Sequence, residues 1–229
     1  VVDDIYYVLD EKNATATVTN YSNGPSQTAG TEYSGDIIIP ETITTESGKT
    51  YTVTAIGDYA FLECTLLNSI TMPNSITGIG RRAFMGCAEL ESAELPKLLT
   101  TIGERAFEGC IKLMSFDFPN SLKSIGESAF SRTGWYELQP EGLVYAGTVA
   151  YHYKGRIPEN TRLLIQEGTT SIADAAFYAD EKYYLDIDNY EGLLSVVIPN
   201  SVKYIGNYVF LDDCDNLQQV TIGSGVEDM

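Results

Sequence analysis

Hydrophobic positions recur along this chain in a six-residue pattern, Ile-Gly-x-x-Ala-Phe, at a constant spacing. The pattern begins at Ile56, Ile79, Ile102 and Ile125, so successive copies are 23 residues apart. Looser copies begin at Ile172 and Ile205. A period of this length is typical of solenoid proteins, in which each repeat forms one coil and stacks on the next.

A second apolar pattern follows each copy and predicts a short β-strand. From Leu67 the apolar positions continue at Ile70 and Met72, and the same alternation follows Leu90 and Leu113. Alternation buries one face of a strand. A proline then ends each strand, because it cannot donate to the ladder. We therefore expect neighbouring strands to stack about 4.8 Å apart in a parallel sheet.

The Ile-Gly-x-x-Ala-Phe segment itself predicts a short helical turn, since its apolar residues lie three or four positions apart. The turn would direct its alanine and phenylalanine inward. Equivalent phenylalanines should then form one buried column, made of Phe61, Phe84, Phe107 and Phe130. The expected fold class is α/β, a solenoid of 23-residue coils with a parallel sheet and short helical turns.

Departures from the regular spacing locate the ends of the array and its insertions. Residues 1–35 hold two alternating segments and predict an N-terminal β cap. The solenoid would span 36–229, with a loop at about 43–53, a β-hairpin within 139–160 and an exposed acidic loop at 178–192. Residues 225–229 align with 75–79, so we expect a truncated last repeat and an uncapped strand at 220–222.

The whole coil, as found from Pro73 to Leu95, resembles the BspA-like (treponemal-type) leucine-rich repeat family. The segments Ile5-Tyr6-Tyr7 and Gly35-Asp36-Ile37-Ile38-Ile39-Pro40 are similar to members from Bacteroidetes. The resemblance implies a secreted or cell-surface bacterial protein with a leucine-rich repeat solenoid. Some members bind host matrix or plasma proteins or mediate adhesion, and the family shares no catalytic residues.

The net charge of the chain limits which classes of partner it can bind. The chain has 14 Lys and Arg against 32 Asp and Glu, a formal net charge of -18. This excess repels nucleic-acid phosphates and anionic lipids, which argues against nucleic-acid binding. No apolar run approaches the roughly 20 residues of a membrane helix, so we expect no membrane insertion by this segment.

Two motifs that resemble a nucleotide-binding site or a metal site are better explained as parts of the repeat. Gly78-Ile79-Gly80-Arg81-Arg82-Ala83 matches a dinucleotide fingerprint. However, the second glycine recurs as Gly103 and Gly126, so it belongs to the repeat. Cysteines recur at the same period, and Thr133 occupies the next slot, which favours buried free thiols over a disulfide or a metal site.

The remaining candidates for chemistry are also weak. His152 lies in the hairpin between two tyrosines and has no nucleophile nearby in sequence. The stretch from Asp186 to Gly192 places its glycine one position late for a calcium loop and lacks the twelfth-position glutamate. We therefore predict no catalytic residue, cofactor or metal site, while incidental calcium at the acidic loop stays open.

Tyrosine is in surplus, with 16 residues, and several lie in the insertions. Tyrosine suits interfaces because it combines apolar area with a hydrogen-bonding tip, although packing of the insertions onto the solenoid explains the surplus too. The candidate contact residues here are Tyr151, Tyr153, Tyr183 and Tyr184. Polar residues that alternate with buried ones should line the concave sheet, namely Ser69, Thr71, Ser92, Glu94, Ser115 and Asp117.

These features predict a non-enzymatic protein-interaction or adhesion module whose partner presents a basic face. By resemblance, the partner would be a host extracellular protein and the location the cell surface or the exterior. Two alternatives stay open. The chain could be a structural spacer array within a larger surface protein, or a carbohydrate-binding or hydrolytic protein that uses the Tyr-rich acidic loops.

Overall fold

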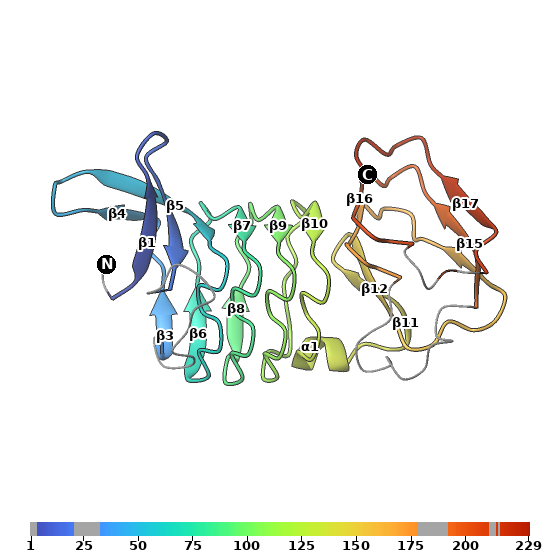
Figure 1. Ribbon diagram of the computed structural model, residues 1–229, viewed down its shortest axis with the longest axis horizontal. Helices are drawn as coiled ribbons and strands as arrows, with labels where there is room; N and C mark the ends of the chain where they lie inside the picture. Colours follow the sequence, from blue (N-terminus) through green and yellow to red (C-terminus); the bar gives the residue numbers. More distant parts are fainter. Residues whose placement is uncertain (1–3, 21–32, 178–191, 211–213, 215) are drawn as a thin grey trace. The chain divides into compact units, whose positions relative to one another are not determined.

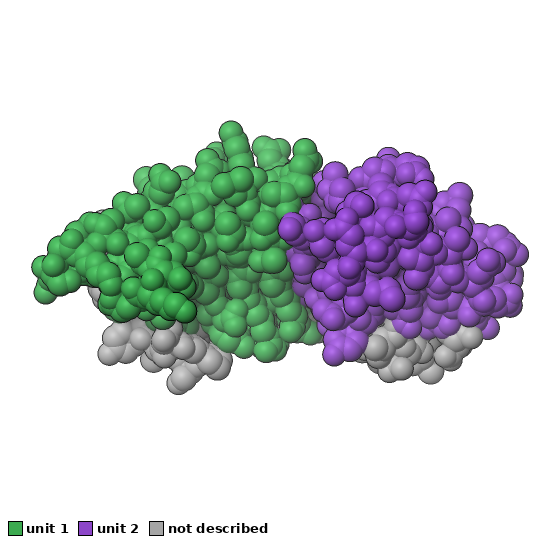
Figure 2. All heavy atoms as spheres, turned by 90° about the horizontal axis from the view of Figure 1, so that it is seen from above, with its two compact units in different colours: residues 1–121, 128–138 green, residues 122–127, 139–229 purple. Residues whose placement is uncertain are grey.

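A computed structural model describes residues 4–20, 33–177, 192–210, 214 and 216–229. The chain divides into two compact units (Figure 2). The first unit comprises Val1–Ser121 and Ser128–Leu138, and the second comprises Leu122–Glu127 and Gln139–Met229. Within the described residues only Gly134–Glu137 form an α-helix, α1. The fold is therefore mostly β, and the expected α/β class is wrong in its helical part.

Parallel strands in the first unit join residues that are 23 positions apart (Figure 1). Ile79 lies opposite both Ile56 and Ile102. Within the first unit, one sheet includes, in order, β1 (Tyr6–Asp10), β2 (Thr15–Thr19), β5 (Thr50–Ile56), β7 (Gly78–Ile79) and β9 (Thr101–Ile102). The other contains β3 (Gly35–Ile38), β6 (Leu67–Thr71) and β8 (Ser92–Glu94).

The start of the chain pairs as a hairpin, since β1 lies antiparallel to β2, and β2 then pairs in parallel with β5. The insertion at 43–53 is a second hairpin and not the expected loop. Its strand β4 (Thr42–Thr44) pairs with β5 and places Ile43 opposite Tyr51. Both of these side chains are buried, so the insertion adds to the core instead of extending into solvent.

The expected helical turns do not form at the described repeats. The residue three positions after each repeat isoleucine has a positive φ, between 51° and 60°, at Tyr59, Arg82, Arg105, Ser128, Ala175 and Tyr208. A left-handed residue interrupts a right-handed helix. The backbone bonds to the next coil instead. The amide of Phe61 donates to the Ala83 carbonyl at 2.7 Å, and the amide of Phe84 donates to the Ala106 carbonyl at 2.7 Å.

The predicted phenylalanine column is confirmed. Phe61, Phe84, Phe107 and Phe130 are fully buried. Their rings stack with centroid separations of 5.0, 5.0 and 5.7 Å and interplanar angles of 8° or less. The column follows from the repeat because each ring occupies the same position in successive coils.

Glycine follows the repeat isoleucine because neighbouring backbones touch there. A Cβ atom on Gly80 would lie 2.5 Å from the amide nitrogen of Asp58, and one on Gly103 would lie 2.5 Å from that of Arg81. A Cβ atom on Gly78 would meet only the Thr101 hydroxyl, at 3.1 Å. The apparent dinucleotide fingerprint is therefore one packing glycine preceded by an unrelated one.

Buried thiols accompany these contacts. Cys64, Cys87 and Cys110 are buried, Cys214 is half-buried, and none of these four thiols forms a disulfide, as expected. The Cys87 thiol donates to the Phe61 carbonyl at 3.0 Å and the Cys110 thiol donates to the Phe84 carbonyl at 3.1 Å. The neighbouring Cys110 thiol and burial hold the pKa of Cys87 well above its usual value. These thiols act as small core residues that also satisfy backbone carbonyls.

One predicted strand, at 116–118, does not form. Phe116 and Phe118 are only half-buried, and their rings pack against Trp135 at 5.8 and 5.1 Å. The Trp135 amide, at the start of α1, donates to the Leu113 carbonyl at 2.8 Å. Helix α1 thus occupies the place of the next strand, and bulky aromatic side chains fill the space.

The second unit combines the predicted hairpin with two parallel pairings. Strands β11 (Gly142–Ala146) and β12 (Val149–Lys154) are antiparallel, and β12 pairs in parallel with β14 (Ser171–Ile172), which pairs with β16 (Tyr204–Ile205). A separate sheet contains β13 (Thr161–Leu164), β15 (Leu193–Ile198) and β17 (Gln219–Ile222). Strand β10 (Ser124–Ile125) also belongs to the second unit, where the Asp174 amide donates to the Ile125 carbonyl.

Replacing Phe107 by alanine should remove a ring that is stacked on both sides within the core. We expect a loss of about 3 to 5 kcal/mol in the free energy of unfolding, measured by chemical denaturation. The control is Glu94→Ala, which changes an exposed strand residue and should cost less than about 0.5 kcal/mol. Equal effects of the two substitutions would contradict the buried column.

The two glycines of the fingerprint should respond differently to alanine. Gly80→Ala forces a methyl group against the backbone of the preceding coil and should destabilise the protein by about 1 to 3 kcal/mol. Gly78→Ala meets only a movable hydroxyl and should cost less than about 0.5 kcal/mol. Thermal melts of both variants would decide, and a larger loss for Gly78→Ala would show that the assigned contacts are wrong.

Candidate functional site

The outward face of the β3-β6-β8 sheet is a regular exposed surface of the first unit. Two rows cross it, made of Asp36, Ser69 and Ser92 and of Ile38, Thr71 and Glu94. We call these six residues the strand face. Ser69 is half-buried and the other five are exposed. The inward row between them is Ile37, Ile70 and Ala93, so period-two alternation produces this surface.

The strand face carries acidic groups beside one apolar side chain. The Ser69 hydroxyl donates to Asp36 Oδ1 at 2.6 Å, which orients this carboxylate. The Ile38 side chain lies at the edge of its row and the residue is 72% exposed. Ser115 and Asp117 are also exposed but lie outside any strand. The structure therefore brings four of the six predicted strand residues onto one sheet face.

A cation borders this acidic surface and was not anticipated from the sequence. Lys112 Nζ lies 2.6 Å from Glu89 Oε2 and 3.3 Å from Glu91 Oε1. The two carboxylates, Glu89 first, raise the pKa of Lys112. The repeat alignment contains the signal for this pair, since Glu89 and Lys112 are 23 residues apart and so occupy equivalent positions in adjacent coils.

A second cluster of charged side chains lies around Glu104. The repeat pattern alone would treat this residue as an exposed turn residue. Its carboxylate lies 3.2 Å from Arg81 Nε, 3.8 Å from Arg82 Nη2 and 3.7 Å from Arg105 Nε. Arg105 also lies 3.6 Å from the buried Glu108. Three arginines face two glutamates in these turns, so the net charge that they offer to a partner is smaller in magnitude than that of the strand face, which has two carboxylates.

The predicted tyrosine contacts in the hairpin are wrong. Tyr151 and Tyr153 are only 2% and 8% exposed. The Tyr153 amide donates to the Ala176 carbonyl at 2.9 Å, which is the bond that a repeat phenylalanine makes with the alanine of the next coil. Tyr153 therefore fills the phenylalanine position of its coil. Burial, followed by the charge of Glu141, raises the pKa of Tyr153.

Tyr183, Tyr184 and most of the possible calcium loop, 186–191, lie outside the described residues. Among the described residues, no group of three or more His, Cys, Asp or Glu side chains could hold a metal ion. In the same part of the chain, no helix is long and apolar enough to cross a membrane.

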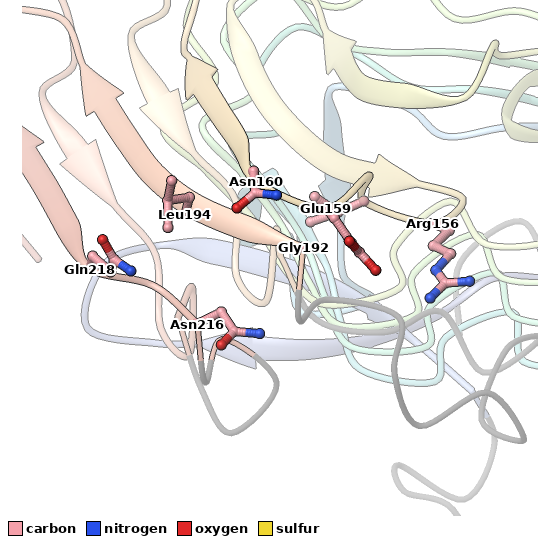
Figure 3. A pocket seen from close by; sticks show the side chains of 8 residues that line it. Arg156, Glu159, Asn160, Gly192, Leu194, Asn216 and Gln218 are labelled. Atoms are coloured by element: carbon pink, nitrogen blue, oxygen red, sulfur yellow. The ribbon is translucent and has the colours of Figure 1, made fainter.

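The second unit contains a polar cavity of about 240 Å³ (Figure 3). Three chain segments line it where they enter the parallel strands β13, β15 and β17. Its lining residues are Arg156, Ile157, Glu159, Asn160, Gly192, Leu194, Asn216 and Gln218. Sequence reasoning missed this cavity, because its residues are far apart in the chain and form no motif.

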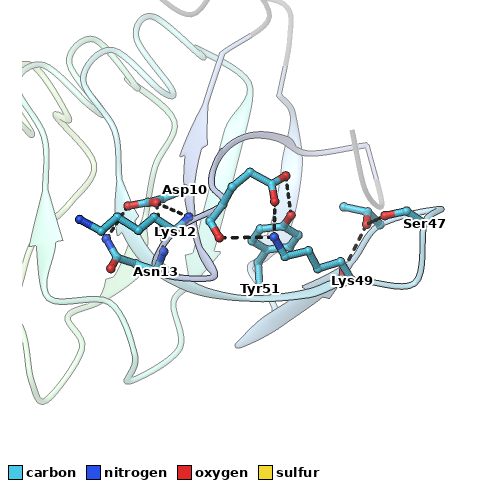
Figure 4. Close-up of polar contacts among 8 residues, drawn as sticks. Asp10, Lys12, Asn13, Ser47, Lys49 and Tyr51 are labelled. Atoms are coloured by element: carbon cyan, nitrogen blue, oxygen red, sulfur yellow. Dashed lines mark hydrogen bonds and ion pairs between the residues drawn. The ribbon is translucent and has the colours of Figure 1, made fainter.

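The turn between β1 and β2 is attached to β5 by a polar cluster (Figure 4). The hydroxyl of the buried Tyr51 donates to Glu11 Oε1 at 2.7 Å, and Lys49 forms an ion pair with Glu11 Oε2. The Lys49 ammonium also lies 5.1 Å from the centroid of the Tyr51 ring. The hydrogen bond from Lys49, and then that from Tyr51, lowers the pKa of Glu11.

Comparison with models of protein families identifies the repeat of this chain. A model of the BspA type leucine-rich repeat region matches residues 41–154 and 181–229, with six copies. The chain belongs to the BspA-type leucine-rich repeat family. In this BspA-type chain the cavity residues 156–160 lie outside both matched ranges, whereas the strand face residues Ser69, Thr71, Ser92 and Glu94 lie within the first.

Solved structures of leucine-rich repeat proteins are similar to this BspA-type chain. A Treponema pallidum protein is 24% identical, with a TM-score of 0.54, over 96% of this chain and 80% of its own. A Bacteroides capillosus protein is 31% identical, with a TM-score of 0.49, over 59% of this chain and 91% of its own. The first likeness supports the leucine-rich repeat fold. Among curated proteins, none matches this chain.

The Glu11 cluster predicts a pH dependence of stability. Because folding lowers the pKa of Glu11, the ion pair stabilises the protein above the ordinary glutamate pKa of about 4.3, and this contribution is lost as the pH falls through the folded value. Glu11→Gln should therefore lower the melting temperature at pH 7, and this deficit should be smaller at pH 3.

The matched control is Glu46→Gln in the exposed turn of the β4-β5 hairpin. It should leave the melting temperature unchanged relative to the parent protein at both pH values. A deficit of Glu11→Gln that persists undiminished at pH 3 would contradict an ionic role for this side chain.

Proposed function

We propose that this chain is a non-enzymatic protein-interaction module that binds its partner through the strand face of the first unit. The observation that carries the proposal is the combination of exposed acidic residues, small polar residues and the exposed Ile38 on one sheet face. Membership of a leucine-rich repeat family supports a binding role. Repeated coils provide a regular, extended scaffold for such a surface.

The chemistry of the strand face defines the partner. Asp36 and Glu94 are exposed carboxylates, and the chain carries a formal charge of -18. A partner with a basic surface would be steered toward this face, and the association should weaken as salt rises. Ile38 is an apolar side chain that a hydrophobic pocket on the partner could desolvate.

We infer further that the chain acts outside the bacterial cell or on its surface, as an adhesive module for host matrix or plasma proteins. The resemblance of the repeat to the BspA-like family supports this location. The regular 23-residue coils would then form a solenoid that displays the strand face. The alternative is a spacer array in a larger surface protein, which would need no exposed binding surface.

Surface plasmon resonance against purified matrix and plasma proteins, at low and at physiological salt, tests this proposal. For a protein that binds, Glu94→Lys combined with Ile38→Ala should weaken the affinity by about tenfold or more, since both a charge contact and an apolar contact are lost. The affinity should also fall from low to physiological salt.

The control is Glu46→Lys, which makes the same charge change in the first unit away from the strand face. It should leave the affinity nearly unchanged. If Glu46→Lys weakens binding as much as the double variant, net charge and not this surface is responsible. If nothing binds at either salt concentration, the spacer alternative is favoured.

A further inference from the structure

We propose that the polar cavity of the second unit binds a neutral sugar and holds a single sugar ring. The cavity lies where three segments enter neighbouring parallel strands (Figure 3). Arg156, Glu159 and Asn160 precede β13, Gly192 precedes β15, and Asn216 and Gln218 precede β17. The topology therefore gathers polar side chains from separate coils at one end of one sheet.

The backbone that frames the cavity is held by hydrogen bonds between the segments. The Thr161 amide donates to the Gly192 carbonyl at 2.8 Å, and the Gln218 amide donates to the Leu194 carbonyl at 2.9 Å. A Cβ atom on Gly192 would lie 2.3 Å from the Ile157 carbonyl oxygen, so glycine allows these segments to touch. Ile157 is itself buried in the core. A fixed frame lowers the entropic cost of binding a ligand.

Four polar side chains of the cavity have unused hydrogen-bonding capacity. Arg156, Glu159, Asn160 and Gln218 are exposed, and none of these side chains has a hydrogen bond or ion pair in the described structure. In contrast, the polar groups of the Glu11 cluster already bond to one another. A ligand in the cavity could therefore gain hydrogen bonds without breaking existing ones.

The charge of the cavity favours a neutral ligand. One guanidinium and one carboxylate line it, from Arg156 and Glu159, and the other polar side chains are the amides of Asn160, Asn216 and Gln218. Amides both donate and accept, as ligand hydroxyl groups do, so they suit a polyhydroxylated molecule. A phosphate or other strong anion would meet one cation only, in a chain of net charge -18.

Size and apolar lining narrow the ligand to one sugar ring. The volume of about 240 Å³ is smaller than the roughly 300 to 1,000 Å³ of sites for drug-sized ligands. Leu194 is half-buried and gives the cavity an apolar patch that a ring C–H face can contact. No aromatic side chain is among the described lining residues, so ring stacking is lacking and we expect a Kd on the order of 1 mM.

NMR titration of the whole chain with glucose, galactose, mannose and N-acetylglucosamine tests this site. At least one sugar should produce saturable shifts of the backbone amides of Asn160, Gly192 and Gln218. Gln218→Ala and Glu159→Ala should each weaken that binding by about fivefold to tenfold, the effect of one lost hydrogen bond. Gln219→Ala is the matched control, because this exposed neighbour in β17 does not line the cavity and its loss should change nothing.

Two results would overturn the proposal. One is that no sugar produces saturable shifts at the cavity while the spectrum shows a folded protein. The other is that free alanine, a zwitterion that could bridge Arg156 and Glu159, binds there and the sugars do not. Sugar affinity should also be the same at low and physiological salt, since a neutral ligand is not screened. Because the strand face is tested with proteins and other variants, either proposal can fail without the other.

Discussion

Neighbouring coils of the first unit approach so closely that no side chain fits between their backbones after the repeat isoleucine. Gly80 and Gly103 lie at these contacts, where a Cβ atom would come within 2.5 Å of the preceding backbone. The same close spacing brings successive phenylalanine rings to 5.0 Å and lets a thiol reach the carbonyl of the coil before it. The strand face depends on it too, since its rows exist only because the strands are in register.

Where the repeat sequence is interrupted at the hairpin, different residues make the contact between neighbouring coils. Strand β12 lies where an Ile-Gly strand would lie, and Tyr153 supplies both the buried ring and the amide of the missing phenylalanine. Thr133 takes a cysteine slot but bonds within its own coil, since its hydroxyl donates to the Phe130 carbonyl at 2.7 Å and accepts from the Tyr136 amide, which caps α1. The backbone bonding between coils is thus more constant than the residues that provide it.

Sequence periodicity predicts the contacts that recur in every coil. It does not predict structure that depends on the backbone conformation of one residue or on a replacement in a single coil. The strand register, the phenylalanine column, the packing glycine and the hairpin could all be predicted, because each follows from residue spacing. The left-handed residue at Tyr59 or Arg82 could not, because these side chains give no sign of a positive φ. The burial of Tyr151 and Tyr153 depends on a coil that lost its own phenylalanine. The polar cavity could not be predicted either, because its three lining segments are far apart in the sequence and come together only through the sheet topology.

The hydrogen bonds between coils have a direction. In the turns, the earlier coil donates to the later one, as the Phe84 amide does to the Ala106 carbonyl, whereas at the repeat glycine the later coil donates, as the Gly103 amide does to the Ile79 carbonyl. Amide hydrogen exchange in a turn therefore reports on the coil that follows, and exchange at a repeat glycine reports on the coil that precedes. Local opening of one coil would expose turn amides on one side of it and a repeat-glycine amide on the other, so exchange rates can identify which coil has opened.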